Sequence, residues 1–190
     1  MMLVVNRKQA GTSLIEIMVS IVVIAIGLLG LASMQMNALK FQKTASQRSE
    51  AVQAAYDLSD RMRANFVYTL PELFAAERTA NETKYTSTGT YATKKAGVYA
   101  PASNCTLAAP AAPCSTDQIA TYDLAEWQRG LQRRLAGGAG YVIPVAGTAV
   151  STFDVTVMWQ EPTLNAVDAS CPGAVAAPVG IRCFTIRLSV

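Results

Sequence analysis

The chain has 190 residues, of which 51% are hydrophobic and only 15% charged, and this composition excludes disorder over most of its length. The formal net charge of +3 is small, so nucleic-acid binding driven by bulk charge has no support. Histidine is absent, which excludes histidine acid–base catalysis and the usual histidine metal sites.

An uncharged apolar segment lies near the start of the chain. Residues 17–34 read IMVSIVVIAIGLLGLASM, and eighteen residues of helix span roughly 27 Å, close to a bilayer core. Arg7 and Lys8 precede the segment, so the positive-inside rule predicts a cytoplasmic N-terminus and a translocated remainder. A cleaved secretory signal is the alternative. The run is longer than the usual signal-peptide core, however, and no Ala-x-Ala site follows it.

Glu16 stands at the edge of this apolar segment. A carboxylate placed in hydrocarbon costs a few kcal/mol. One interpretation puts Glu16 at the lipid headgroups, solvated and without a role. The other is that it meets a cationic partner once the segment leaves the membrane.

Residues 11–16 read GTSLIE, follow a short basic leader and open the apolar helix. This arrangement resembles the class III signal of type IV prepilins. The resemblance implies that a prepilin peptidase cuts between Gly11 and Thr12 and methylates Thr12. It also implies that Glu16, as the fifth mature residue, acts in subunit assembly. The family usually has Phe or Met at the first mature position, where this chain has Thr12.

Three further stretches resemble the minor-pilin family called type IV pilus modification protein PilV. They are residues 26–31 (IGLLGL), 56–65 (YDLSDRMRAN) and 122–127 (YDLAEW). The resemblance implies a type IV pilin fold of class α+β and a minor pilin that enters type IV pili or initiates their assembly. The implied partners are the prepilin peptidase, the other minor pilins, the major pilin, the inner-membrane assembly machinery and, before assembly, membrane lipid.

Two other functions remain open. A minor pseudopilin of a type II secretion system shares the N-terminal signal. A pilus-tip adhesin or DNA-binding subunit would instead use exposed cations, for which the sequence offers Lys84, Lys94 and Lys95, with Tyr85 and Tyr91, or Arg129, Arg133 and Arg134. We expect these cations to be ordinary solvated groups and nucleic acid not to be a partner.

A single long helix is predicted from about residue 12 to residue 65, because no Pro occurs before Pro71 and no Gly occurs between Gly30 and Gly89. Residues 1–11 are expected to be a cleaved leader, 12–39 the transmembrane and assembly half of the helix, and 40–190 the periplasmic head. Gly27 and Gly30 either permit bending or let a neighbouring helix approach closely.

The second half of this helix is amphipathic. Its apolar stripe should pack on a sheet, and the residues assigned to it are Ala45, Val52, Ala55, Tyr56 and Met62. Asp57 with Arg61, and Asp60 with Arg63, are expected to be surface ion pairs.

Beyond the long helix, residues 66–114 are irregular by pattern, and Ser115 and Gln118 then form a capping box. The helix that follows should end at Gly137 and bury an apolar stripe made of Ala120, Leu124, Trp127, Leu131 and Leu135. Residues 141–145, 153–160 and 184–190 read as strands. Because no helical crossovers join them, an antiparallel sheet is expected.

The four cysteines all follow the apolar segment, which places them in the oxidising periplasm if the topology holds. Three pairings are possible, and local closure favours Cys105 with Cys114 and Cys171 with Cys183. Neither spacing is typical of a zinc or redox site. No nucleophile–base constellation occurs in the sequence, so we expect no enzymatic activity, no metal and no cofactor.

Overall fold

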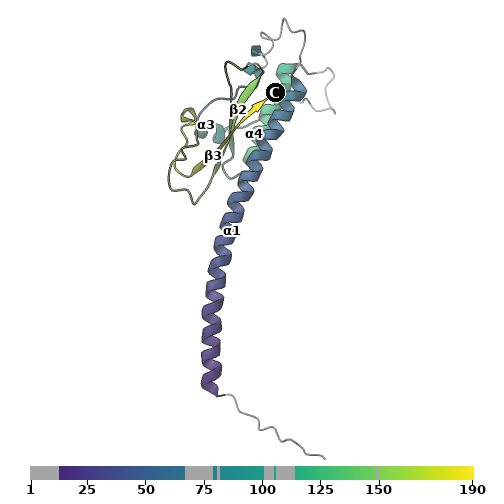
Figure 1. The fold of residues 1–190 in the computed structure, drawn as a ribbon. Coiled ribbons are helices and arrows are strands. Elements are labelled where there is room, and N and C mark those ends of the chain that lie inside the picture. The colour runs from purple at the N-terminus through teal and green to yellow at the C-terminus, as the bar shows by residue number, and fades with distance from the viewer. Residues whose placement is uncertain (1–12, 67–78, 81, 101–104, 106–113, 149) are drawn as a thin grey trace, which may run out of the picture. The chain divides into compact units, whose positions relative to one another are not determined.

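A computed structural model describes residues 13–66, 79–80, 82–100, 105, 114–148 and 150–190 of the chain. The chain divides into two compact units, one ending at Thr44 and the other running from Ala45 to Val190. Helix α1, Leu14–Asn65, belongs to both units, and it is the single long helix that the sequence predicts (Figure 1).

The part of α1 in the second unit buries one face. That face consists of Ala51, Ala54, Ala55, Leu58 and Met62. The small alanine side chains let the other elements of this unit approach the helix backbone closely. The stripe expected from the sequence is wrong for Ala45 and Tyr56, which are exposed, because the buried face is rotated away from them.

A three-stranded sheet forms the centre of the second unit. Its strands are β1 (Ala139–Pro144), β2 (Thr152–Gln160) and β3 (Ile181–Ser189), in the order β1-β2-β3. Both pairs are antiparallel, as expected for strands without helical crossovers. A long helix packed on this sheet confirms the predicted α+β class and agrees with a type IV pilin-like fold.

Helices α3 and α4 and a short 3-10 helix, Gly173–Val175, also belong to the second unit (Figure 1). Helix α4 is Thr116–Arg134, and its capping box between Ser115 and Gln118 is confirmed. The predicted apolar stripe of α4 is confirmed too, because Trp127 and Leu131 are fully buried in the core. Helix α3, Tyr91–Ala96, lies within the region predicted to be irregular, and Thr90 caps it.

Both faces of the sheet are covered. On one face the side chains of α1 and α4 pack against Phe153, Val155 and Val157 of β2. On the other face Met158 of β2 packs in a second cluster with Tyr91, Tyr141, Val175 and Ile181. Helix α3 and the segment before β3 therefore cover this face of the sheet.

A glycine-rich turn positions β1 against α4. Gly137 has a φ of +62°, a left-handed conformation that favours glycine. A Cβ added to Gly140 would overlap the ring of Trp127, so only glycine lets β1 pass this close to α4. The side-chain amide of Gln128 accepts a hydrogen bond from the N–H of Gly140 (3.0 Å) and donates one to its carbonyl (2.8 Å).

Candidate functional site

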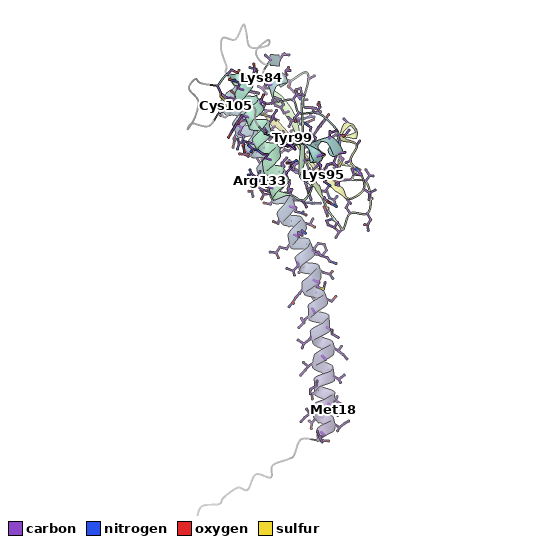
Figure 2. The ribbon with its side chains drawn as sticks, turned by 180° about the vertical axis from the view of Figure 1, so that it is seen from behind. Met18, Lys84, Lys95, Tyr99, Cys105 and Arg133 are labelled. Atoms are coloured by element: carbon purple, nitrogen blue, oxygen red, sulfur yellow. A yellow bond between two sulfur atoms is a disulfide. The ribbon has the colours of Figure 1, made fainter. Side chains whose placement is uncertain are left out.

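The apolar half of α1 is the first candidate for a functional surface. Every residue from 13 to 43 is exposed, and side chains project from this part of the helix on all sides (Figure 2). Among the described residues, α1 is the one helix long and apolar enough to cross a membrane. Apolar side chains in such numbers are stable only when lipid or other helices cover them.

Glu16 lies in the first turn of this apolar helix and is exposed. Its backbone carbonyl accepts a hydrogen bond of 2.7 Å from the hydroxyl of Ser20. Its carboxylate makes no hydrogen bond or ion pair with any described residue. Gly11 and Thr12, the predicted cleavage and methylation positions, lie outside the described residues.

Gly27 and Gly30 leave two gaps in the side-chain surface of the helix. A Cβ added at either position would meet nothing within 4 Å. No contact with the described part of the chain therefore requires glycine here. The open space at both glycines fits a helix that bends here, and it equally fits a neighbouring helix that approaches closely.

The cysteines form two local disulfides in the second unit. Cys105 is joined to Cys114, and Cys171 is joined to Cys183 of β3. These are the pairs that local closure favours. Asp168 lies just before the second bridge and accepts hydrogen bonds from the backbone N–H groups of Ser170 and Cys183 (both 3.0 Å).

Asp168 is a buried carboxylate with several donors around it. Burial by itself would raise its pKa, but the hydroxyl and N–H of Ser170, the N–H of Cys183 and the charge of Arg182 together lower it. Arg182 also pairs with Glu161, with its Nε 2.8 Å from Oε2. The ionised carboxylates thereby hold the segment between β2 and β3 against the sheet.

A buried polar network joins α1, α4 and residue 85. The hydroxyl of Tyr85 donates to Oδ2 of Asp123 (2.8 Å), and Asn65 donates to the Tyr85 oxygen (3.0 Å). Arg61 reaches Oδ1 of Asp123 at 3.5 Å and Asp57 at 3.2 Å. The expected pair of Asp57 and Arg61 is present, and Arg61 also reaches from it into the network.

The network shifts the pKa values of its members. Burial raises the pKa of Tyr85, and the neighbouring carboxylate of Asp123 raises it further. Burial also raises the pKa of Asp123, although the Tyr85 hydroxyl and Arg61 act in the opposite direction. These shifts come from structural packing, since Tyr85 is fully buried and cannot meet a substrate.

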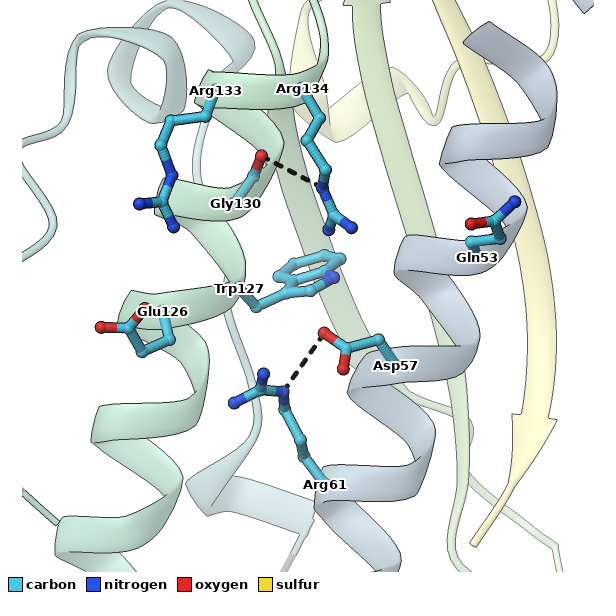
Figure 3. A pocket seen from close by; sticks show the side chains of 8 residues that line it. All are labelled: Gln53, Asp57, Arg61, Glu126, Trp127, Gly130, Arg133 and Arg134. Carbon is cyan, nitrogen blue, oxygen red and sulfur yellow. Dashed lines mark hydrogen bonds and ion pairs between the residues drawn. The ribbon is translucent and has the colours of Figure 1, made fainter. Parts of the chain in front are cut away.

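A polar groove of about 570 Å³ lies between α1 and α4. Figure 3 shows Trp127 in the groove between the two helices, with Arg61 and Asp57 on one side and Arg133 and Arg134 on the other. The indole N–H of Trp127 donates to the carbonyl of Ala54 (2.8 Å), so this side chain anchors α4 to α1 and is not free for a ligand. The groove contains no Ser, Thr or Cys nucleophile among its described lining residues.

The cations considered for nucleic-acid binding are mostly paired within the second unit. Lys84 contacts Thr116 and Asp117, Lys94 donates to Ser87, and Lys95 lies over the ring of Tyr91. Arg129 pairs with Glu126, and Arg134 with Glu50. Tyr85 and Tyr91 are buried, so their rings are not available to stack on the bases of a nucleic acid.

Two structural roles were missed at the sequence level. Asp123 lies four residues before Trp127, on the buried side of α4, and a carboxylate there signals a buried partner. Asp168 carries no such periodic signal, because it lies outside helices and strands. Only the folded chain brings it to the N–H of Cys183.

Comparison with known proteins gives one match. Residues 6–32 match the family model described as the prokaryotic N-terminal methylation motif. No curated protein and no solved structure matches the chain. The matched segment contains the basic leader, Gly11, Glu16 and the start of the exposed apolar helix. The motif thus indicates a type IV pilin-like or pseudopilin protein, a class whose members are generally structural, made with a prepilin signal and anchored by its apolar helix.

Proposed function

We propose that this protein is a minor pilin that enters type IV pili or initiates their assembly. The observation that carries the proposal is the coincidence of the methylation motif with a fully exposed apolar helix. Such a helix suits two environments in turn, the lipid bilayer before assembly and a bundle of neighbouring pilin helices afterwards.

The proposed sequence of events begins in the inner membrane. Residues 12–39 cross the bilayer, the leader of residues 1–11 faces the cytoplasm, and the head of residues 40–190 faces the periplasm. A prepilin peptidase removes the leader after Gly11 and methylates Thr12. The assembly machinery then transfers the helix from lipid into the bundle, where it contacts the major pilin and the other minor pilins.

Glu16 has a defined part in this proposal. Cleavage creates an α-amino group on Thr12, and Glu16 lies one helical turn away in the same chain. A carboxylate and an amino group that both leave water are strongly destabilising unless they pair. In a helix bundle, Glu16 would meet the amino group of an adjacent subunit, and one axial stagger alone would neutralise both charges.

The assignment to a pilus rather than a secretion system rests on the resemblance to the PilV family. Two of the stretches that carry it, residues 56–65 and 122–127, contact each other through Arg61 and Asp123. They therefore belong to one structural unit, in which the end of α1 is fixed to α4. A type II pseudopilin remains the alternative, because it shares the N-terminal motif.

Copurification tests the proposal and separates the two systems. Full-length tagged protein is extracted from inner membranes in mild detergent, and the bound proteins are identified by mass spectrometry. Recovery of minor pilins, together with loss of pili in a deletion strain and unchanged protein secretion, is the expected result. Recovery of pseudopilins with a secretion defect would instead assign the protein to a type II system.

A further inference from the structure

The two edge strands of the sheet, β1 and β3, differ in whether their outward backbone groups have hydrogen-bond partners. On β1, the residues whose backbone groups point outward are Gly140, Val142 and Pro144, and none of the three has a free backbone N–H. Gln128 bonds both backbone groups of Gly140, and Ser87 bonds both of Val142 (2.9 and 3.0 Å). Pro144 has no backbone N–H and therefore cannot donate a hydrogen bond to an added strand. The β1 edge is closed against another strand.

The outward residues of β3 follow from the hydrogen bonds at its two ends. The N–H of Val190 donates to Ser151, and the N–H of Glu161 donates to Gly180 (both 2.8 Å). Opposed residues in an antiparallel pair alternate between bonded and non-bonded, so the even-numbered residues of β3 bond to β2. The backbone groups of the odd-numbered residues therefore point away from the sheet.

Only the two ends of this edge have partners within the described chain. Ile181 donates to Pro178, Cys183 donates to Asp168, and the carbonyl of Ser189 accepts from Arg63. Between them, the N–H and C=O groups of Thr185 and Arg187 have no hydrogen-bond partner among the described residues. Both residues are exposed, so the middle of the β3 edge is free to pair with another strand.

The surface beside this free edge is apolar on the side that faces α1. Phe184 and Ile186 pack against the main core but are only partly buried. A strand added to the edge would cover them with its own side chains on that face. On the opposite face Thr185 and Arg187 are exposed, so polar residues fit there.

A pocket of about 340 Å³ lies at the start of the same edge. Its lining includes Arg48 of α1, Trp159 of β2, and Phe184 and Thr185 of β3. Trp159 is 1% exposed, and its Nε1 is buried without a hydrogen-bond partner among the described residues. An orphaned donor of this kind costs free energy unless an acceptor reaches it. Arg48 is exposed and has no ion-pair partner in the described chain, which makes a carboxylate the fitting acceptor.

We propose that the β3 edge binds an extended segment of another protein, which adds to the sheet as a fourth, antiparallel strand. The segment alternates apolar residues, facing α1, with polar ones. Its last apolar-side position carries an acidic side chain that enters the pocket of Arg48 and Trp159. This surface is separate from the apolar half of α1, so binding here does not depend on pilus assembly.

The test uses the full-length protein in detergent micelles and a synthetic, C-terminally amidated heptapeptide, VTVTVTE, with a fluorophore on a soluble linker. Its Val and Glu side chains share one face. Three control peptides change one property each: VTVTVTQ removes the charge, VVVTTTE removes the alternation, and an N-methylated form removes donors from the backbone. Binding is measured by fluorescence anisotropy.

Hydrogen exchange reports the register of the added strand directly. We expect the bound peptide to slow amide exchange at Thr185 and Arg187 by roughly tenfold or more. Exchange at Ile186 and Leu188, which already bond to β2, should not change. Unaltered exchange at Thr185 and Arg187 under saturating peptide would overturn the proposal.

Proline variants test the same backbone groups by mutation. Thr185→Pro and Arg187→Pro each remove one outward N–H and should weaken peptide binding by roughly tenfold. Thr185→Ala and Arg187→Ala are the matched controls, because they lose the same side-chain contacts with Thr156 and Asp154 but keep the N–H. Two proline variants are made because the test needs only one of them to fold. Folding is judged by the thermal unfolding midpoint of each variant.

The pocket is tested through the acidic residue. Arg48→Ala should abolish the preference for VTVTVTE over VTVTVTQ while leaving the binding of VTVTVTQ unchanged. Equal binding of the proline and alanine variants, or an acidic preference that survives Arg48→Ala, would contradict the proposal. Neither outcome bears on the minor-pilin proposal, because no pilus is involved in the assay.

Discussion

The hydroxyl of Tyr85 donates a 2.8 Å hydrogen bond to the carboxylate of Asp123, 38 residues further along the chain. Asn65, the last residue of α1, donates to the same hydroxyl. One phenol group thereby links the end of α1, the middle of α4 and the segment that covers the edge of β1. This link fixes the end of α1 to α4 within the second unit.

Tyr85→Phe should lower the free energy of unfolding by about 1–2 kcal/mol, because it removes one hydrogen-bond partner from the buried carboxylate of Asp123 and one from the amide of Asn65. Chemical denaturation of the full-length protein in detergent measures this loss. Tyr56→Phe is the matched control, since Tyr56 is 47% exposed, and it should change the stability by less than about 0.5 kcal/mol. Equal effects of the two changes would mean that the network adds nothing to stability.

Asp168 should make the stability of the head depend on pH. Its pKa in the folded state lies below the ordinary value, so its contribution is complete above the unfolded pKa of about 4. The contribution is lost as the pH falls through the folded pKa. Asp168→Asn should therefore cost about 1–2 kcal/mol at pH 7, and the difference from the wild type should shrink as the pH falls below about 4.

Thermal unfolding of both proteins across that pH range provides the measurement. Asp117→Asn serves as the control, because the side chain of Asp117 is 73% exposed. A cost for Asp168→Asn that is the same at pH 3 and pH 7 would show that its charge is irrelevant.

Each disulfide should stabilise the oxidised head by about 3 kcal/mol, since each closes a short loop and restricts the unfolded chain. Cys171→Ser combined with Cys183→Ser should also loosen the contact between Asp168 and β3. Cys105→Ser combined with Cys114→Ser should leave that contact intact. Non-reducing peptide mapping checks the pairing, and four free thiols or a bridge from Cys105 to Cys183 would contradict it.

Glu16→Ala should leave membrane insertion and cleavage intact and impair entry into the fibre or its initiating complex. Glu16→Gln should behave similarly, because it retains the shape and loses the charge that would pair with an amino group. Co-immunoprecipitation with the other minor pilins, alongside pilus counts, measures the effect. Gln42→Ala, on the exposed surface of the same helix, is the control. Normal assembly in both Glu16 variants would mean that Glu16 has no role in assembly and only lies at the lipid headgroups.

Processing should produce a mature chain that begins at Thr12. Mass spectrometry of the N-terminal peptide from purified membranes tests this, and it also reports whether Thr12 is methylated. Gly11→Ala is the milder perturbation and Gly11→Leu the stronger one, since a larger side chain obstructs the approach of the peptidase. A mature form that starts at Met1, or beyond residue 34, would contradict the prepilin interpretation.

Much of the fold follows from local pattern. The run without Pro or Gly predicts α1, and Ser115 with Gln118 predicts the start of α4, because helix propensity and capping act over a few residues. The alternation in residues 153–159 predicts β2 for the same reason. These features depend on neighbouring residues along the chain, so they can be predicted from the sequence alone.

Which face of α1 is buried is harder to predict from the sequence. Ala45 and Tyr56 are assigned to the buried stripe from the helical spacing of apolar residues, yet both are exposed. An alanine-rich helix has little contrast between its faces, so which face is buried depends on the elements that pack on it. Here Trp127 selects the face through its bond to Ala54.

The sequence by itself determined the prepilin-like signal, the apolar helix and the α+β order of elements. Each of these follows from consecutive residues or from a helix or strand periodicity of a few residues. Only the tertiary structure decided that Tyr85 meets Asp123, that Asp168 caps Cys183, and that β1 is closed while the middle of β3 is open. Those relationships join residues that are distant along the chain. Their partners are chosen by register and packing, which no local pattern encodes.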